Sequence, residues 1–461
     1  MKAIAPSSAA IALLAAALIV PPLAAASEKT HAEPKSEKSE KKKKKAKNNP
    51  KPASSHKHTN PAKDSKEALA EIIGPVPGIK PDKDFNLCKW LDHDPGLLFE
   101  NKKNPWISSF EIGGRFQYQA AYVDGNDVNG RDYHDAYDEY RRFRLESKTE
   151  FLKYLTAEIN LNLVDDNRFR DGGHQDVSWG YDRFDEASLE FDIGKAFGDG
   201  FLDGIKLKYG RMKLKMSEEA HQSSKEIYTI ERSTLSDRLG GEEGRPTGVT
   251  LELDKADWEL TLGVFSGEDD ADFLGGWNDG EFYYASLEWK PDDDLTFRLD
   301  YSQNDRSGAD DSLGYSWAGA LSAHYDKKEW GFITEAVYGD NGSAPDLIER
   351  RQGNFTGFVV MPWYWIIEDK LQAVVRYEYG SSSELQGLQT TSRYLRAAHD
   401  DLLVDDDNGR GHQLNSIYFG LNYHFCPDKL KIMGGISYDD LDTRESNVRT
   451  MTYEVAFRAA F

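Results

Sequence analysis

Basic side chains stand at alternate positions of several segments whose other positions are apolar. Arg142 and Arg144, for example, alternate with Phe143 and Leu145. In an extended chain this period of two puts the charged and apolar side chains on opposite faces. A row of cations along one face of a sheet attracts anions and guides them. The cations that strand parity assigns to the polar face are Arg115, Arg142, Arg144, Lys148, Lys206, Lys208, Arg298, Arg376, Lys431 and Arg458.

Patterns for catalysis or metal binding are weak by comparison. The sequence contains neither G-x-S-x-G nor H-E-x-x-H, and its 11 histidines are scattered. Aspartate clusters at 269–272, 310–311, 400–401 and 405–407 offer oxygen ligands for calcium, but without EF-hand spacing, so we interpret them as solvated loop charge. We therefore predict no enzyme, no metal site, no cofactor and no nucleic-acid partner.

Sixteen segments between Phe110 and Phe461 show the two-residue period, which predicts strands. Their connections alternate between short links, such as 152–154 and 427–429, and long polar loops, such as 124–140 and 380–412. A soluble β-sandwich lacks this regular alternation of connection length. We therefore predict an all-β protein, a 16-stranded antiparallel transmembrane β-barrel whose short turns face the periplasm, with a disordered basic N-terminal tail.

The aromatic residues support this interpretation. They make up 12% of a chain with a mean hydropathy of only −0.67, and many lie at strand ends, where interfacial girdles form in outer-membrane barrels. We expect Trp289, Trp330, Trp363 and Trp365 to belong to such girdles. The chain also ends on an outward-facing aromatic residue, Phe461, as outer-membrane barrels do.

The N-terminal part divides into three predicted segments before a barrel at 107–461. Residues 1–26 read as a secretory signal peptide. Residues 27–66 carry 13 lysines against five acidic residues, a net +8, and predict a disordered periplasmic tail. Residues 67–106 form a periplasmic pre-barrel segment. Removing this +8 and Lys2 from the net −22 leaves −31 on residues 67–461.

A barrel of sixteen strands leaves a water-filled lumen, because only about eight strands close on their own side chains. The charged connection Leu214–Pro246 follows the fifth strand and is the third long loop, which suits a segment folded into the lumen. The candidate constriction residues on this loop are Lys215, Lys225, Glu231, Arg232, Arg238 and Arg245.

The two cysteines, Cys88 and Cys426, both fall on the predicted periplasmic side, one before the first strand and one in a late short turn. A disulfide between them would pin the pre-barrel segment beneath the barrel. Two free thiols are the alternative.

The sequence resembles the outer-membrane porins O and P, the phosphate-selective porin family. The resemblance spans roughly residues 107–461 and is strongest at Arg141–Leu145, Lys208–Lys213 and Ile230–Ser233. It implies a trimeric diffusion channel in the outer membrane, contacting lipid, in which basic side chains guide anions such as phosphate.

Strand parity, however, also turns twelve acidic residues inward, slightly more than the ten cations. We therefore expect a passive channel for small hydrophilic solutes or ions with weak ion selectivity. The alternative function is a structural one, in which residues 27–66 bind peptidoglycan and tether the membrane to the cell wall. The inward acidic residues are Glu111, Glu146, Glu150, Glu158, Glu186, Glu190, Glu252, Glu259, Glu288, Asp300, Glu378 and Glu454.

Overall fold

A computed structural model describes most of the chain after residue 85, all of it within the compact unit Pro81–Phe461. The predicted signal peptide, the Lys-rich tail with its predicted peptidoglycan contact, and the aspartate clusters lie outside the described residues and stay predictions. The described residues are 86–92, 95–126, 129–164, 169–170, 183–198, 200–240, 244–267, 277, 280–305, 313–342, 352–385, 387–389, 410–443 and 447–461.

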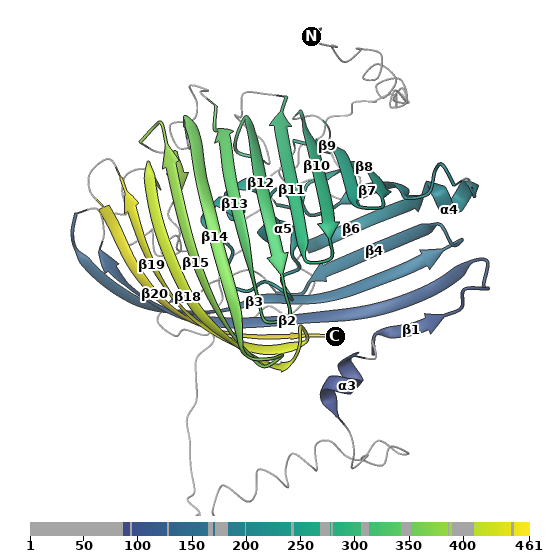
Figure 1. Cartoon of the computed structure of the whole chain (residues 1–461), viewed down its shortest axis with the longest axis horizontal. Helices are drawn as coiled ribbons and strands as arrows, with labels where there is room; N and C mark the ends of the chain where they lie inside the picture. Colours follow the sequence, from purple (N-terminus) through teal and green to yellow (C-terminus); the bar gives the residue numbers. More distant parts are fainter. Residues whose placement is uncertain are drawn as a thin grey trace, which may run out of the picture. The chain divides into compact units, whose positions relative to one another are not determined.

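Within the described residues, sixteen long antiparallel strands form one sheet that closes on itself (Figure 1). Closure comes from β2, the first long strand, which pairs with β20, the last, from Arg115 opposite Ala460 to Asn126 opposite Arg449. The predicted 16-stranded barrel is thus confirmed. The strands are β2 (Ile107–Asn126), β3 (Asp132–Phe151), β4 (Leu155–Asn162), β6 (Arg183–Asp192), β7 (Ile205–Arg211), β8 (Thr247–Lys255), β9 (Trp258–Ser266), β10 (Glu281–Asp292), β11 (Leu295–Asn304), β12 (Trp317–Asp326), β13 (Trp330–Asp340), β14 (Asn354–Ile367), β15 (Leu371–Ser382), β18 (Gln413–Cys426), β19 (Leu430–Asp442) and β20 (Asn447–Ala460).

Four shorter strands complete the inventory of the described residues. β1 (Leu97–Glu100) pairs with β2, and β5 (Phe169–Arg170) pairs with β3. β16 (Leu388–Gln389) and β17 (Arg410–Gly411) pair only with each other.

The strands separate an apolar outer face from a polar inner face, as β18 illustrates. Its outward residues Ile417, Phe419 and Leu421 are 49, 50 and 41% exposed, whereas the intervening Tyr418 is 2% exposed. An apolar face without a protein neighbour is what a lipid-facing wall requires. The two-residue period in the sequence therefore arises because alternate side chains face the lipid and the barrel interior.

The short turns lie at the barrel end from which β2 starts and at which β20 finishes. Several need a left-handed backbone, with φ of 51° at Leu152, 71° at Lys153, 57° at Asp369 and 54° at Asp428. Two consecutive left-handed residues, as at Leu152 and Lys153, match the right-handed twist of the adjoining strands in a tight hairpin. A longer turn at this end contains α4 (Ile193–Phe197), capped by Asp192.

At the opposite end, β2 and β3 extend further than expected. The predicted loop 124–140 is largely strand, since β2 runs to Asn126 and β3 starts at Asp132. Each strand has 20 residues, about twice the 9–11 that cross a bilayer. These extensions are polar, as expected for strands that continue beyond the membrane. Apolar alternation in the sequence therefore did not predict them.

The pre-barrel segment joins the sheet at the seam between β2 and β20. The chain end reaches Gly114, with the amide of Gly114 donating to the Phe461 carbonyl at 3.2 Å. Beyond that point β1 takes over as partner of β2, with Glu100 opposite Ser109. Backbone groups of β2 that extend past the end of β20 are thereby satisfied.

The helix α3 (Leu87–Asp92) lies at the same end of the barrel and is covalently attached to it (Figure 1). Cys88 on α3 forms a disulfide with Cys426, the last residue of β18, at a Cα–Cα distance of 5.1 Å. No helix in the described part of the chain is long and apolar enough to cross a membrane.

The disulfide predicts the thiol content of the protein. Unreduced, denatured protein should react with less than about 0.1 equivalent of a thiol reagent, and reduced protein with two, because both cysteines are paired. Cys88→Ala should expose one thiol, at Cys426. Two reactive thiols before reduction would contradict the pairing.

Candidate pore constriction

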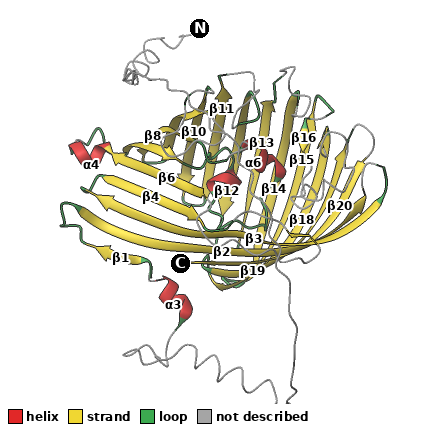
Figure 2. Cartoon of the chain, turned by 180° about the vertical axis from the view of Figure 1, so that it is seen from behind, coloured by secondary structure: helices red, strands yellow, loops and turns green. Residues whose placement is uncertain are grey.

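The segment 212–246 between β7 and β8 folds into the barrel interior. It contains two short helices, α5 (Glu218–His221) and α6 (Thr234–Leu239), and the structure describes all of it except 241–243. Figure 2 shows α6 surrounded by the barrel wall. We call residues 212–246 the constriction loop.

The loop carries an apolar side that packs against the inner wall. Leu235 and Leu239 are 1% and 0% exposed and belong to the same buried cluster as Phe355 and Val359 of β14. Gly357 of β14 lies between these two wall residues, and a Cβ there would meet the Leu235 side chain at 2.5 Å. Burying a leucine contributes roughly 1.5–3 kcal/mol. The inner wall is therefore apolar where the loop covers it.

A buried charge cluster fixes the first helix of the loop. The Glu218 carboxylate accepts hydrogen bonds from Arg298 Nε at 3.0 Å and His324 Nδ1 at 2.9 Å. The Glu218 amide donates to the Glu335 carboxylate at 2.8 Å. Ser217 caps the helix by accepting from the Ala220 amide. These partners come from β11, β12 and β13, so the cluster ties α5 to three strands.

Burial alone would raise the pKa of Glu218, but the His324 hydrogen bond and the Arg298 charge outweigh it and lower this pKa to about 2. A carboxyl whose pKa falls from 4.5 on folding stabilises the folded state above the unfolded pKa. That stabilisation is lost only as the pH falls through the range from about 4.5 to about 2. The anchor is therefore ionised at neutral pH.

Four of the ten predicted inward cations lie beneath the loop. Arg298, Arg376, Lys431 and Arg458 are 8, 7, 2 and 3% exposed. Lys431 donates to the Ile227 carbonyl at 3.1 Å, and Arg458 donates to carbonyls of the loop as well. Strand parity correctly predicts that these side chains point inward, but the loop covers them. They hold the loop and do not line open water.

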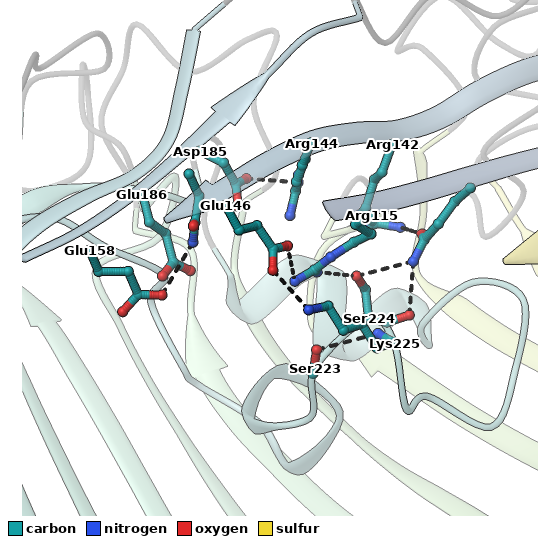
Figure 3. Close-up of polar contacts among 12 residues, drawn as sticks. Arg115, Arg142, Arg144, Glu146, Glu158, Asp185, Glu186, Ser223, Ser224 and Lys225 are labelled. Carbon is teal, nitrogen blue, oxygen red and sulfur yellow. Dashed lines mark hydrogen bonds and ion pairs between the residues drawn. The ribbon is translucent and has the colours of Figure 1, made fainter. Parts of the chain in front are cut away.

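Other lumen-facing charges meet the loop in two clusters (Figure 3). In the first, Glu146 lies between Arg115 at 2.6 Å and the loop residue Lys225 at 2.8 Å. The Arg115 guanidinium also donates to the Ser224 hydroxyl at 2.6 Å. Because Arg115 and Glu146 lie on β2 and β3, this cluster joins the loop tip to the barrel wall.

In the second cluster, Asp185 on β6 lies between Arg144 at 2.7 Å and the loop residue Arg245 at 3.2 Å. Arg245 also approaches Glu186 at 3.8 Å. Arg142 lies on the side of the first cluster and donates to the Gln117 side chain at 2.8 Å.

Two β-bulges place pairs of consecutive charged residues inside the barrel. On β6, Glu186 pairs with Asn160 and Phe184 pairs with Leu161, so Asp185 is an extra residue. On β3, an irregularity between Gln117 and Gln119 of β2 lets both Arg141 and Arg142 face inward. Strict alternation turns Asp185 and Arg141 outward, which is why sequence reasoning missed them as lumen residues.

The other predicted loop residues have diverse surroundings. Glu231 pairs with Arg141 at 2.8 Å, and Arg232 donates to the Glu219 carbonyl at 2.7 Å. Arg238 is buried at 6% exposure and donates to the Gly314 carbonyl. Lys215 is exposed, and its backbone carbonyl accepts from Tyr284 at 2.8 Å.

The prediction that Trp363 belongs to an interfacial girdle is wrong. Its ring is 3% exposed and stacks on Tyr228 of the loop at a centroid distance of 4.0 Å. The neighbouring Tyr364 is 54% exposed and faces outward instead. Trp365 shares the parity of Trp363 and lies 4.9 Å from the His424 ring. Position near a strand end did not distinguish the two faces.

A closed transmembrane barrel whose third long connection folds inward to narrow the lumen is the architecture of outer-membrane porins. Residues 110–291 match the family model described as "Phosphate-selective porin O and P". This match confirms the predicted resemblance over those residues, and together with the closed barrel it indicates a porin, a passive channel through the outer membrane.

Solved structures of porins are similar to the chain at low sequence identity. The outer membrane channel DcaP of Acinetobacter baumannii is 13% identical, with a TM-score of 0.51 over 79% of this chain and 99% of that chain. The anion-selective porin from Comamonas acidovorans is 12% identical, with a TM-score of 0.48 over 77% and 99%. At this identity the DcaP similarity establishes the fold. No curated protein sequence matches the chain.

Removing the buried carboxylate of Glu218 tests the anchor of the constriction loop. Glu218→Gln should weaken the loop's attachment by about 1.5–3 kcal/mol, because Arg298 loses one of its two carboxylate partners and keeps only Glu288. Tryptic cleavage within the loop should then accelerate at least about tenfold, and open-channel current noise should rise, while the barrel stays folded.

The matched control is Glu226→Gln, which removes an exposed carboxylate from the same loop. Its cleavage rate and current noise should equal those of the unmodified protein. Equal behaviour of the two variants would show that Glu218 does not anchor the loop.

Proposed function

We propose that this porin passes small hydrophilic solutes and ions with a weak preference for anions. The observation that carries this proposal is the pairing of charges at the constriction. Glu146 and Asp185 each lie between two cations, so neither the cations nor the carboxylates act alone on a passing ion.

The charge balance at the constriction is small and positive. Arg115, Arg142, Arg144, Lys225 and Arg245 contribute five positive charges, and Glu146, Asp185 and Glu186 contribute three negative charges, a net +2. A positive constriction raises the local concentration of anions. Paired charges lose much of their long-range field, and salt screens the rest over about 8–10 Å. We therefore propose weak selectivity in place of a dedicated phosphate filter.

Arg115, Arg142 and Arg144 are the proposed constriction cations among the ten predicted pore-lining residues. Lys148, Lys206 and Lys208 are proposed to line the wider lumen on the periplasmic side. Lys206 pairs with Glu252, and Lys208 approaches Glu158 at 3.7 Å, so this wall is also mixed. The net −31 on residues 67–461 opposes a strong anion preference as well.

Reversal potentials in a KCl gradient across planar bilayers test the selectivity. We expect an anion-to-cation permeability ratio above one and below about ten. Asp185→Asn should raise the ratio and Lys225→Gln should lower it. Each change should be about twofold, because one charge at ~8 Å in water contributes roughly 0.5 kcal/mol, salt screening roughly halves this energy, and anion and cation respond in opposite directions.

Asp293→Asn, in an exposed periplasmic turn, removes the same charge away from the constriction and should leave the ratio unchanged. A strong anion preference in the unmodified protein, or a cation preference, would contradict the proposal.

We also propose that three copies of the chain assemble in the membrane, as the family resemblance implies. The molar mass in detergent, measured by light scattering with the detergent contribution subtracted, should be three times the mass of one chain. A mass of one or two chains would overturn this assembly.

A further inference from the structure

A pocket of about 190 Å³ opens inside the barrel near its periplasmic end, between β3, β4, β6 and β7. At the ~30 Å³ that one water occupies in the liquid, its volume corresponds to roughly six waters. The pocket is thus large enough for a small solute. Its lining residues are Lys148, Glu150, Lys153, Tyr154, Thr156, Glu158, Ser188, Glu190, Asp192, Lys195, Lys206 and Lys208.

Strand register explains why this set combines both signs of charge. Lys148 of β3 lies opposite Glu158 of β4, which in turn lies opposite Ser188 of β6. One step closer to the turns, Thr156 lies opposite Glu190, which lies opposite Lys208 of β7. Lumen-facing residues of neighbouring strands therefore form rows of lysines, carboxylates and hydroxyls that converge on one pocket.

Several of these charges already neutralise one another. Lys195 pairs with Asp192 at 3.2 Å, and Lys208 approaches Glu158 at 3.7 Å. Lys206 pairs with Glu252, which lies just outside the pocket. The charges of these three lysines are therefore partly neutralised.

Glu150 accepts a hydrogen bond from the Ser108 hydroxyl, and Lys153 lies in the turn between β3 and β4. Lys148 and Glu190 are therefore the lining charges on the strands that remain available. Within the described part of the chain neither makes a hydrogen bond or an ion pair, and Lys148 is exposed to the lumen while Glu190 is half-buried. They lie on β3 and β6, with β4 between them, so they face the pocket from two sides. Thr156 and Glu158 of β4 lie between them in register, and the Ser188 hydroxyl lies opposite Glu158.

We propose that this pocket binds small zwitterions such as free amino acids on their way through the pore. The solute's carboxylate contacts the Lys148 ammonium, and its ammonium contacts the Glu190 carboxylate. This inference rests on the proposed function, because a solute reaches the pocket through the channel.

The balance of charges selects a zwitterion over a simple ion. A monoanion attracted by Lys148 also meets Glu190, and a cation attracted by Glu190 also meets Lys148. A solute that carries both signs satisfies both groups at once. The pocket is smaller and more polar than sites that hold ligands tightly, which suits a channel, since a solute must bind weakly enough to leave.

The test measures the current through single channels in KCl at pH 7 while L-alanine is added to the periplasmic side. Alanine should block the current with a dissociation constant on the order of 10 mM. Propionate, propylamine and lactamide match alanine in size but carry a negative charge, a positive charge and none, respectively. Each should block at least about tenfold more weakly.

The variants Lys148→Gln and Glu190→Gln should each weaken the alanine block about tenfold or more, because each removes one charge-assisted contact. Lys290→Gln and Glu259→Gln are matched controls, since they remove the same charges from other strands of the barrel and neither residue lines the pocket. Both controls should keep the alanine block unchanged.

The outcomes separate the pocket from the pore. Propionate that blocks as strongly as alanine would make the pocket an anion site and overturn the inference. Normal KCl conductance with no alanine block, or a block that Lys148→Gln and Glu190→Gln leave intact, would overturn the inference while the proposed function stands. Absence of conductance in the unmodified protein would overturn the proposed function itself.

Discussion

The pairing of β2 with β20 is the interaction on which the rest of the structure depends. In the hydrocarbon core no water can satisfy a backbone amide or carbonyl, so a sheet is tolerated there only when it has no open edge. Closure forces side chains to alternate between lipid and interior along every strand. It also explains why β1 is present, since β2 continues past the end of β20 and its remaining backbone groups take β1 as partner.

The interior of the closed wall is divided between packing and transport. On one side the constriction loop forms a buried core with β14. Lys431 and Arg458 donate hydrogen bonds to carbonyls of the loop. Near the loop tip and at Asp185, cations alternate with carboxylates where the loop meets the wall. The proposed selectivity therefore depends on the charges at which loop and wall meet, and not on the total number of inward cations.

The strands, their number and their closure could be predicted because alternation and loop length follow directly from the membrane. The inward direction of Arg376 and Lys431 also followed from parity. Their burial could not be predicted, because parity does not reveal where a distant loop packs. Asp185 and Arg141 escaped prediction for another reason, since a bulge adds one residue and shifts the parity locally. Trp363 shows the same limit, because an aromatic residue suits both a lipid interface and a loop contact.

The disulfide between Cys88 and Cys426 affects how the first and last long strands, β2 and β20, come to pair. β2 and β20 are separated by most of the chain, and closing a flexible loop of the 338 residues between the cysteines costs about 5 kcal/mol of chain entropy. Once formed, the covalent bond holds the segment before β2 next to the hairpin that precedes β20. Once the disulfide has formed, the pairing of β2 with β20, which are the most distant paired strands in the sequence, becomes a local encounter.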